Sequence, residues 1–212
     1  MRVALITSLL LGTSLSSFAQ FRFDPHLRGI LSVGLRNTVS TFHNAGATQP
    51  GLGVGGHFRL NFNSRVNTEW HADYITAAIN HAGKRNVYHI GWSVMYYPIY
   101  KTVQKFTAAK PYFMIGHCFD LVQVVQSSDN RVVAKRWSAA PTVGIGNHFP
   151  IKDRIDFSFA LQYMLHVGKG LEARAVNGSV AIEERNGFLW DGHVLLTMSV
   201  NYKLKKLWKE KG

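Results

Sequence analysis

The strongest constraint on the fold is a stretch near the C-terminus in which residue character alternates at every position. In "FLWDGHVLLTMSVNY", which runs from Phe188 to Tyr202, the even positions are Phe, Trp, Gly, Val, Leu, Met, Val and Tyr. The odd positions are Leu, Asp, His, Leu, Thr, Ser and Asn. A period of two places successive side chains on opposite faces of a β-strand. The stretch therefore predicts a strand with one apolar and one polar face.

The same pattern recurs along the chain, with turn signals between the repeats. The predicted strands cover residues 28–39, 53–62, 66–78, 87–97, 111–123, 137–149, 154–166 and 188–203. Short turns are expected at 63–65 and 150–154, whereas longer polar loops are expected at 40–52, 79–86, 125–131 and 167–187. The link "PIYKTVQKFTAAK" is also long and could hold one helical turn. Mostly short turns at one end and long loops at the other are typical of bacterial outer-membrane barrels, which places both termini in the periplasm.

The composition of the two faces indicates which one meets lipid. The polar faces combine charged residues with Gly, Ala and Ser, which suits a narrow lumen, whereas the apolar faces are bulky and continuous. Charged residues make up 17% of the chain, below the roughly 25% of soluble domains. We therefore predict an all-β fold, an eight-stranded antiparallel transmembrane β-barrel over residues 20–203, with its apolar face outward. The stretch "PYFMIGHCFDLVQ" alternates poorly and puts His117 on the lipid face.

Aromatic side chains near the strand ends are expected to form girdles at the two membrane interfaces. They are Trp70, Tyr74, Tyr88, Trp92, Tyr96, Trp137, Tyr163, Trp190 and Tyr202.

The two ends of the chain carry signals of their own. Residues 1–19 have the pattern of a secretory signal peptide, with Arg2, the apolar core "VALITSLLLGTSL" and small residues before Gln20. No later apolar run approaches the roughly 18 residues of a membrane-spanning helix. Residues 204–212 form a basic tail, for which we expect solvent exposure; the alternative is contact with anionic headgroups or a periplasmic partner. Cys118 is the only cysteine, so no internal disulfide is possible.

Charged residues on the polar face predict an ion-pair network inside the barrel. The candidates are Arg36, Arg59, Glu69, Asp73, Arg154, Asp156 and Asp191. An eight-stranded barrel has room only for side chains, and buried charges there must be paired, so a plugged lumen is predicted. A three-residue turn at 63–65 that keeps both apolar faces together pairs Arg59 with Glu69 and His57 with His71.

Histidines on the same face raise the question of a metal. They are His57, His71, His89, His148, His166 and His193. His57 and His71 together with Asp73 or His89 could bind zinc, but no tight ligand spacing accompanies them. We therefore expect a hydrogen-bond network, with no metal and no cofactor. Ser138 and His166 could approach each other at the loop end, yet no Gly-x-Ser-x-Gly motif is present, and an enzyme is not expected.

Two segments carry a resemblance to a known family. "GWSVMYYPIYKTVQKFTAAKPYFMIGHCFDL" and "VGIGNHFPIKDRIDFSFALQYML" resemble hairpins of the small outer-membrane β-barrel proteins common in Bacteroidota, which are related in architecture to OmpA- and OmpX-like barrels. The resemblance covers about Arg28 to Tyr202 and implies fold and location rather than activity. One departure is the end, where Tyr202 is followed by "KLKKLWKEKG".

The expected function is a structural or interaction role, as an adhesion protein or platform, through long extracellular loops and without an open pore. Binding would then map to residues 40–52 and 167–187. The alternatives are a subunit of an envelope secretion or assembly machine and a lipid-modifying enzyme. Expected partners are outer-membrane lipids and lipopolysaccharide, the barrel assembly machinery, and an envelope protein that the sequence does not identify. The formal charge of +12 comes with no nucleic-acid motif, so no nucleic-acid partner is expected.

Overall fold

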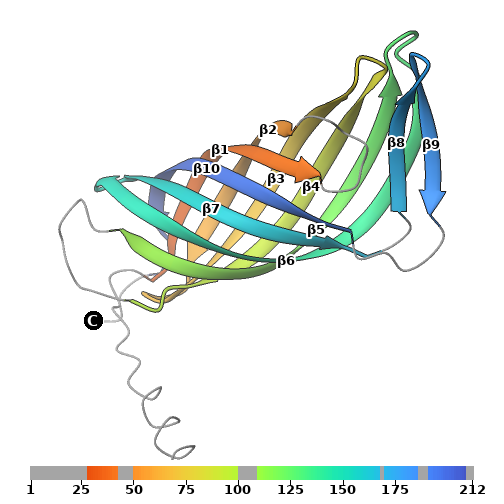
Figure 1. Ribbon diagram of the computed structural model, residues 1–212. Coiled ribbons are helices and arrows are strands. Elements are labelled where there is room, and N and C mark those ends of the chain that lie inside the picture. Colours follow the sequence, from red (N-terminus) through yellow and green to blue (C-terminus); the bar gives the residue numbers. More distant parts are fainter. Residues whose placement is uncertain (1–27, 43–49, 100–108, 168–169, 186–190, 209–212) are drawn as a thin grey trace, which may run out of the picture.

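Eight strands form a closed antiparallel barrel, and two further strands form a separate hairpin beside it (Figure 1). The computed structural model describes residues 28–42, 50–99, 109–167, 170–185 and 191–208. The barrel strands are β1 (Ile30–Phe42), β2 (Gly51–Asn61), β3 (Val66–Ile79), β4 (Gly83–Tyr96), β5 (Lys110–Gln126), β6 (Val132–Lys152), β7 (Ile155–His166) and β10 (Asp191–Lys206). The hairpin consists of β8 (Gly170–Val176) and β9 (Ser179–Arg185). The predicted signal peptide lies outside the described residues.

Pairing of the first and last strands closes the barrel. The strand order is β1-β10-β7-β6-β5-β4-β3-β2, and β2 pairs again with β1. Closure leaves no free sheet edge, which is what a strand structure needs in lipid. The predicted fold class is therefore confirmed. Across the described residues, no helix is long and apolar enough to cross a membrane.

The first and last described segments meet at one end of the barrel. The backbone N–H of Leu207 donates to the carbonyl of Gly29 at 2.7 Å, and the N–H of Gly29 donates to that of Asn61 at 2.7 Å. The backbone N–H of Lys203 donates to the carbonyl of Arg154 at the β6–β7 turn, at 2.8 Å. These segments therefore share an end with the short turns, and β8 and β9 lie at the opposite end (Figure 1).

Strand β5 alternates strictly, although its sequence predicted a weak pattern. Cys118 and Asp120 are fully buried, whereas Ile115 and Phe119 on the other face are exposed. His117 faces outward, as its position predicted, and its ring lies 4.7 Å from that of Phe119. The poor pattern arose because Tyr112, Met114 and Val122 place apolar side chains inside the barrel.

Outward-facing side chains change from apolar to polar partway along the neighbouring strands β3 to β6. One cross-strand row consists of Tyr74, Tyr88, Leu121 and Trp137. The next outward-facing row, farther from the termini, consists of Thr76, Asn86, Gln123 and Lys135. The aromatic row has the character of an interfacial girdle. Strands β3 to β6 therefore leave the lipid at this row and continue beyond it.

At the aromatic row, inward-facing side chains of the same strands change from polar to apolar. Below the aromatic row, the lumen holds the paired row Asp73, His89, Asp120 and Ser138. Above it, Ile75, Val87 and Val122 are almost completely buried and belong to one apolar core. Residues 75–87 and 122–136 thus have mostly polar outer faces and mostly apolar inner faces, with the buried Arg85 and the partly buried Arg136 as charged exceptions on the inner face. Together with 170–185 we call these two segments the head.

The hairpin β8–β9 covers the head core and was missed by the sequence analysis, which expected a loop at 167–187. Leu171 and Ala173 are buried in the apolar core of the head. The turn consists of Asn177 and Gly178, with φ of 49° and 78°. Asn-Gly between alternating residues is the strongest short-range hairpin signal, because type I′ turns need positive φ at both positions. The signal was present in the sequence but was assigned to a loop.

Two other boundaries differ from the sequence analysis. The predicted loop at 79–86 is only a tight turn between Ile79 and Gly83, with positive φ at Asn80 and His81. At the other end, β10 extends to Lys206, beyond the predicted strand end at 203. Part of the basic tail is therefore strand.

The predicted girdle aromatics lie outside the barrel where they are described, and Trp190 is not among the described residues. Exposed aromatics are Tyr74, Tyr88, Trp92, Trp137, Tyr163 and Tyr202, and Trp70 and Tyr96 are partly exposed. The rings of Tyr74 and Tyr88 lie 5.1 Å apart on neighbouring strands. Cross-strand ring contacts of this kind stabilise the outer surface.

The change of face predicts a position-dependent cost for charge on the outer surface of β5. Phe119→Arg, below the aromatic row, should lower the free energy of unfolding in liposomes by roughly 2 kcal/mol, because lipid does not solvate a charge. Gln123→Arg, above the row on the same strand, should change it by less than about 0.5 kcal/mol. Urea unfolding of both variants in liposomes measures the difference. Equal losses would mean that the lipid boundary does not lie between these positions.

Candidate functional site

A network of buried arginines and carboxylates fills the half of the lumen nearest the termini. Arg59 in β2 lies opposite Glu69 in β3, the register that the three-residue turn predicted. The Arg59 Nη2 atom is 2.7 Å from Glu69 Oε2. Arg59 Nη1 is 3.5 Å from Asp156 Oδ1 and 3.1 Å from His148 Nδ1. The guanidinium therefore joins β2 to β3, β6 and β7 across the barrel.

A second arginine extends the network toward the middle of the barrel. Arg36 Nη1 is 3.1 Å from Glu69 Oε1, and Arg36 Nε is 3.0 Å from Asp73 Oδ1. Asn201 donates from Nδ2 to Asp156 Oδ1 at 2.8 Å. Each carboxylate thus faces a donor, as buried charges require. The two arginines share Glu69, which makes this carboxylate the centre of the network.

Little free space remains beside this network. A cavity of about 10 Å³ lies between Glu69, Tyr112, Gln162 and Ser199. This is about the room that one water molecule needs. The lumen is therefore plugged at this level.

A second polar cluster lies directly below the head. Asp120 Oδ2 is 2.8 Å from His166 Nδ1, and Asp120 Oδ1 is 3.3 Å from His89 Nε2. His166 Nε2 is 2.8 Å from His193 Nδ1. The Cys118 thiol donates to Asp120 Oδ1 at 3.1 Å. The cluster joins β4, β5, β7 and β10 around one carboxylate.

Ser138 also belongs to this cluster, as the sequence analysis suggested. Its Oγ atom is 3.1 Å from His166 Nδ1, the same nitrogen that Asp120 contacts. In a Ser-His-Asp relay, the hydroxyl and the carboxylate use opposite ring nitrogens. Ser138 is also buried inside the barrel, away from the lipid-facing surface. The arrangement therefore lacks the geometry of that relay.

Two charged residues predicted for the lumen, Arg154 and Asp191, are not observed there. The Arg154 side chain is exposed in the β6–β7 turn, where its Nη1 atom lies 3.5 Å from the Tyr202 hydroxyl, so its assignment to the lumen was wrong. The alternation that placed it inside ends at Ile155, where the strand begins. The Asp191 side chain lies outside the described part of the structure. The others, Arg36, Arg59, Glu69, Asp73 and Asp156, are buried in the lumen.

The structure divides the predicted lumen histidines between the two clusters. His57 lies opposite His71, hydrogen-bonds through Nε2 to Asn201 Oδ1, and sits 3.8 Å from Glu69 Oε2. His148 belongs to the same cluster through its contact with Arg59. His89, His166 and His193 belong to the cluster around Asp120.

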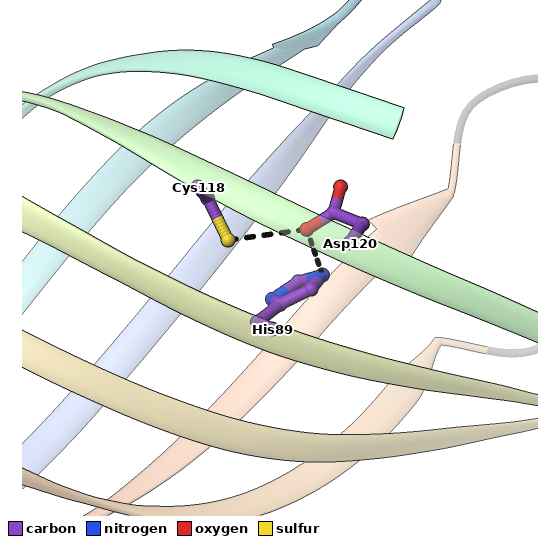
Figure 2. Close-up of side chains that lie close together, drawn as sticks. All are labelled: His89, Cys118 and Asp120. Atoms are coloured by element: carbon purple, nitrogen blue, oxygen red, sulfur yellow. Dashed lines mark hydrogen bonds and ion pairs between the residues drawn. The ribbon is translucent and has the colours of Figure 1, made fainter. Parts of the chain in front are cut away.

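The grouping of possible metal ligands differs from the one that the sequence suggested. Among the described residues, the group with three ligand atoms within 4.8 Å of one another is His89, Cys118 and Asp120 (Figure 2). The pair His57 and His71 is not part of such a group. The sequence analysis did not consider Cys118 as a ligand. The available signal was the spacing Cys-x-Asp in a strand, which places both side chains on one face.

Comparisons with known proteins support the fold and give no closer relationship. No protein-family model matches the chain, and no curated protein sequence does. The outer-membrane protein OprG of Pseudomonas aeruginosa is similar in structure, with a TM-score of 0.50, 14% identity, and coverage of 84% of this chain and 96% of OprG. Neisserial surface protein A gives a TM-score of 0.49 at 12% identity, covering 82% of this chain and 96% of that one.

Ail, the attachment invasion locus protein of Yersinia pestis, gives a TM-score of 0.46 at 9% identity, covering 84% of this chain and 99% of that one. The similarity to OprG shows that the chain has the fold of a small outer-membrane β-barrel. A relationship to Bacteroidota proteins in particular stays a prediction.

The contact between Arg59 and Glu69 predicts strong coupling between the two residues. Arg59→Ala and Glu69→Ala should each lower the free energy of unfolding by roughly 3 kcal/mol, because each strands a buried charge. The double variant should lose clearly less than the sum of the two. Urea unfolding of the four proteins in liposomes measures this cycle. Arg154→Ala is the control and should cost less than about 0.5 kcal/mol, and additive losses for the pair would refute the contact.

Proposed function

We propose that the protein is a closed outer-membrane barrel whose head serves as an interaction platform on the cell surface. The observation that carries this proposal is that, above the aromatic row, the outward-facing side chains become mostly polar and the inward-facing side chains become mostly apolar. Strands β3 to β6 do not stop at the lipid boundary but build a folded structure with its own apolar core. A barrel that only needed to span the membrane would use strands of about 10 residues, whereas β5 has 17 and β6 has 21.

The lumen supports a binding role rather than transport. Its lower half holds the network of Arg36, Arg59 and Glu69, and its upper half holds the cluster around Asp120. Above both, Leu171 and Ala173 of β8 pack on the head core. A solute would have to break buried ion pairs and displace the hairpin to pass. The platform proposal therefore includes the absence of an open pore.

The hairpin offers a specific means of contact. Among the described residues, β8 and β9 pair only with each other, so both keep an outer edge. An unpaired strand edge can add a strand from another protein through backbone hydrogen bonds. Arg174 in β8 projects an exposed side chain beside this edge. A protein segment in extended conformation is therefore the partner that this surface suits best.

Lipopolysaccharide is the second expected partner, at the base of the head. Lys135 belongs to the first polar row above the aromatic girdle, and Lys84 lies one row farther out. Both side chains are exposed. Basic groups at this height would meet the phosphate groups of lipopolysaccharide in the outer leaflet. This arrangement also fits insertion by the barrel assembly machinery with the head outside and the termini in the periplasm.

The two alternatives receive less support. A lipid-modifying enzyme would be favoured by the contact between Ser138 and His166, but the hydroxyl points into the lumen and shares its nitrogen with Asp120. We therefore propose no catalytic role. A subunit of an envelope machine would use the same hairpin edge, but from the periplasmic side of the membrane. Orientation separates this alternative from the platform.

Cysteine labelling on intact cells tests the orientation. In a Cys118→Ser background, Ser179→Cys should react with a membrane-impermeant maleimide because the head faces outward. Asp153→Cys, in the exposed β6–β7 turn, should react only after the outer membrane is opened. Both positions are exposed in the structure, so protection reports sidedness rather than burial. The opposite labelling pattern would place the head in the periplasm and favour the envelope-machine alternative.

Photocrosslinking tests the platform itself. A photoreactive amino acid at Ser179 should give a discrete protein adduct on intact cells, because this position lies at the turn of β8–β9. The matched control is Val143, which is exposed on the lipid face, and it should give no protein adduct. Once the adduct identifies the partner, replacing residues 170–185 by a short Gly-Ser turn should preserve the heat-modifiable migration of the barrel but abolish copurification of that partner without crosslinking. An unchanged recovery, or no adduct at Ser179, would reject the platform.

A further inference from the structure

Three side chains of different chemistry converge on one point between β4 and β5. His89 and Asp120 face each other across these strands, and Cys118 lies two residues before Asp120 on the same face. In Figure 2 the Cys118 thiol and the His89 ring both point toward one carboxylate oxygen of Asp120. The separations are 3.1 Å from Cys118 Sγ and 3.3 Å from His89 Nε2 to Asp120 Oδ1.

These separations are close to those of ligands around a small tetrahedral cation. With bonds of about 2.0–2.3 Å to zinc, the ligand atoms of a tetrahedral site lie roughly 3.3–3.8 Å from one another. The three ligand atoms here all lie within 4.8 Å of one another. Small rotations of the side chains would therefore bring all three within bonding distance of one ion.

Hydrogen bonding alone does not account for the position of His89. Its side chain is 1% exposed, and neither ring nitrogen makes a well-directed hydrogen bond to the described residues. Buried polar groups normally have partners, so a buried ring without one calls for an explanation. The Nε2 atom points at the Asp120 carboxylate without a bond of good geometry. A cation between them would satisfy both groups.

The neighbouring residues have the arrangement of an outer ligand shell. His166 Nδ1 lies 2.8 Å from Asp120 Oδ2, the oxygen that faces away from Cys118. His193 and Ser138 hold the His166 ring through contacts of 2.8 Å and 3.1 Å. Ligating carboxylates are typically oriented by neighbouring polar groups, and loss of such a neighbour weakens metal binding. The site is therefore built before any ion arrives.

We infer that His89, Cys118 and Asp120 bind one divalent transition-metal ion, with zinc as the best match. A thiolate, an imidazole and a carboxylate together form a ligand set that suits zinc, whereas calcium and magnesium take oxygen ligands. Binding forms the three metal–ligand bonds and releases the Cys118 proton to solvent. The thiolate and the carboxylate then carry two negative charges, which offset the charge of the ion, and a water molecule would complete the four ligands of a tetrahedral site. The platform proposal does not depend on this site.

The position of the site gives the ion a structural role. Cys118 belongs to the same apolar core as Ile75, Val122 and the hairpin residue Leu171. The ligands therefore lie at the junction of the polar lumen and the head. An ion there would tie β4 to β5 directly beneath the head core. Bound metal should accordingly raise the stability of the head together with that of the barrel.

Cobalt provides a direct test. Untagged protein is folded into detergent micelles with cobalt(II), freed of excess metal, and its metal content and absorption spectrum are measured. We expect about one ion per chain and a thiolate-to-cobalt charge-transfer band in the near ultraviolet. Zinc should displace cobalt and remove the band. A heat-modifiable, folded wild-type protein that retains less than a tenth of an equivalent of either metal would overturn the inference.

Variants assign the ligands. Cys118→Ser should abolish the charge-transfer band, and His89→Gln should weaken binding. His166→Gln should lower affinity about 10- to 100-fold while the band is kept, because this residue only orients the carboxylate. The matched control is His117→Gln, on the outer face of β5, the strand that carries Cys118 and Asp120. This variant should bind metal as the wild type does. Retention of the band in Cys118→Ser, or equal weakening in His117→Gln, would also overturn the assignment.

Discussion

The absence of water in the lipid core is the constraint on which the rest of this structure depends. Every backbone N–H and C=O in the membrane must find a partner within the protein, because an unpaired group costs several kcal/mol there. The pairing of β1 with β10 meets this demand by closing the sheet. Closure with eight strands leaves an interior only wide enough for side chains. The lumen therefore has to be a packed interior, and its polar residues have to pair with one another.

The lumen meets this second demand with a small number of shared groups. Glu69 accepts both arginines, and Asp120 contacts two histidines and a thiol. Each cluster ties strands together that are distant in sequence, such as β2 to β7 through Arg59 and Asp156. Loss of one member would leave others buried without a partner. The two clusters thus stabilise the closed barrel from inside, in addition to the hydrogen bonds of its wall.

The number of barrel strands, the outward-facing apolar surface and the register of β2 against β3 followed from alternation and turn length, because both are local properties of the sequence. The head could not be predicted in this way. Its inner face is mostly apolar, whereas membrane barrels normally place polar residues on the inner face. Val122 therefore fell outside the expected alternation of the stretch that became β5. Arg154 was misplaced because alternation was continued into a turn. The grouping of Cys118 with His89 depends on the pairing of β4 with β5, and no signal within either strand reveals it.

The shared core of the head has a consequence for how the molecule assembles. Leu171 and Ala173 belong to one core cluster with side chains from β3, β4 and β5 and with Leu195 of β10. The hairpin therefore has no complete surface to dock on until the strands on both sides of the closing seam are in place. Docking of β8–β9 would thus be a late event, one that marks a finished barrel. A docked hairpin would therefore indicate that insertion of the barrel is complete, and it would lie on the side of the membrane opposite the termini.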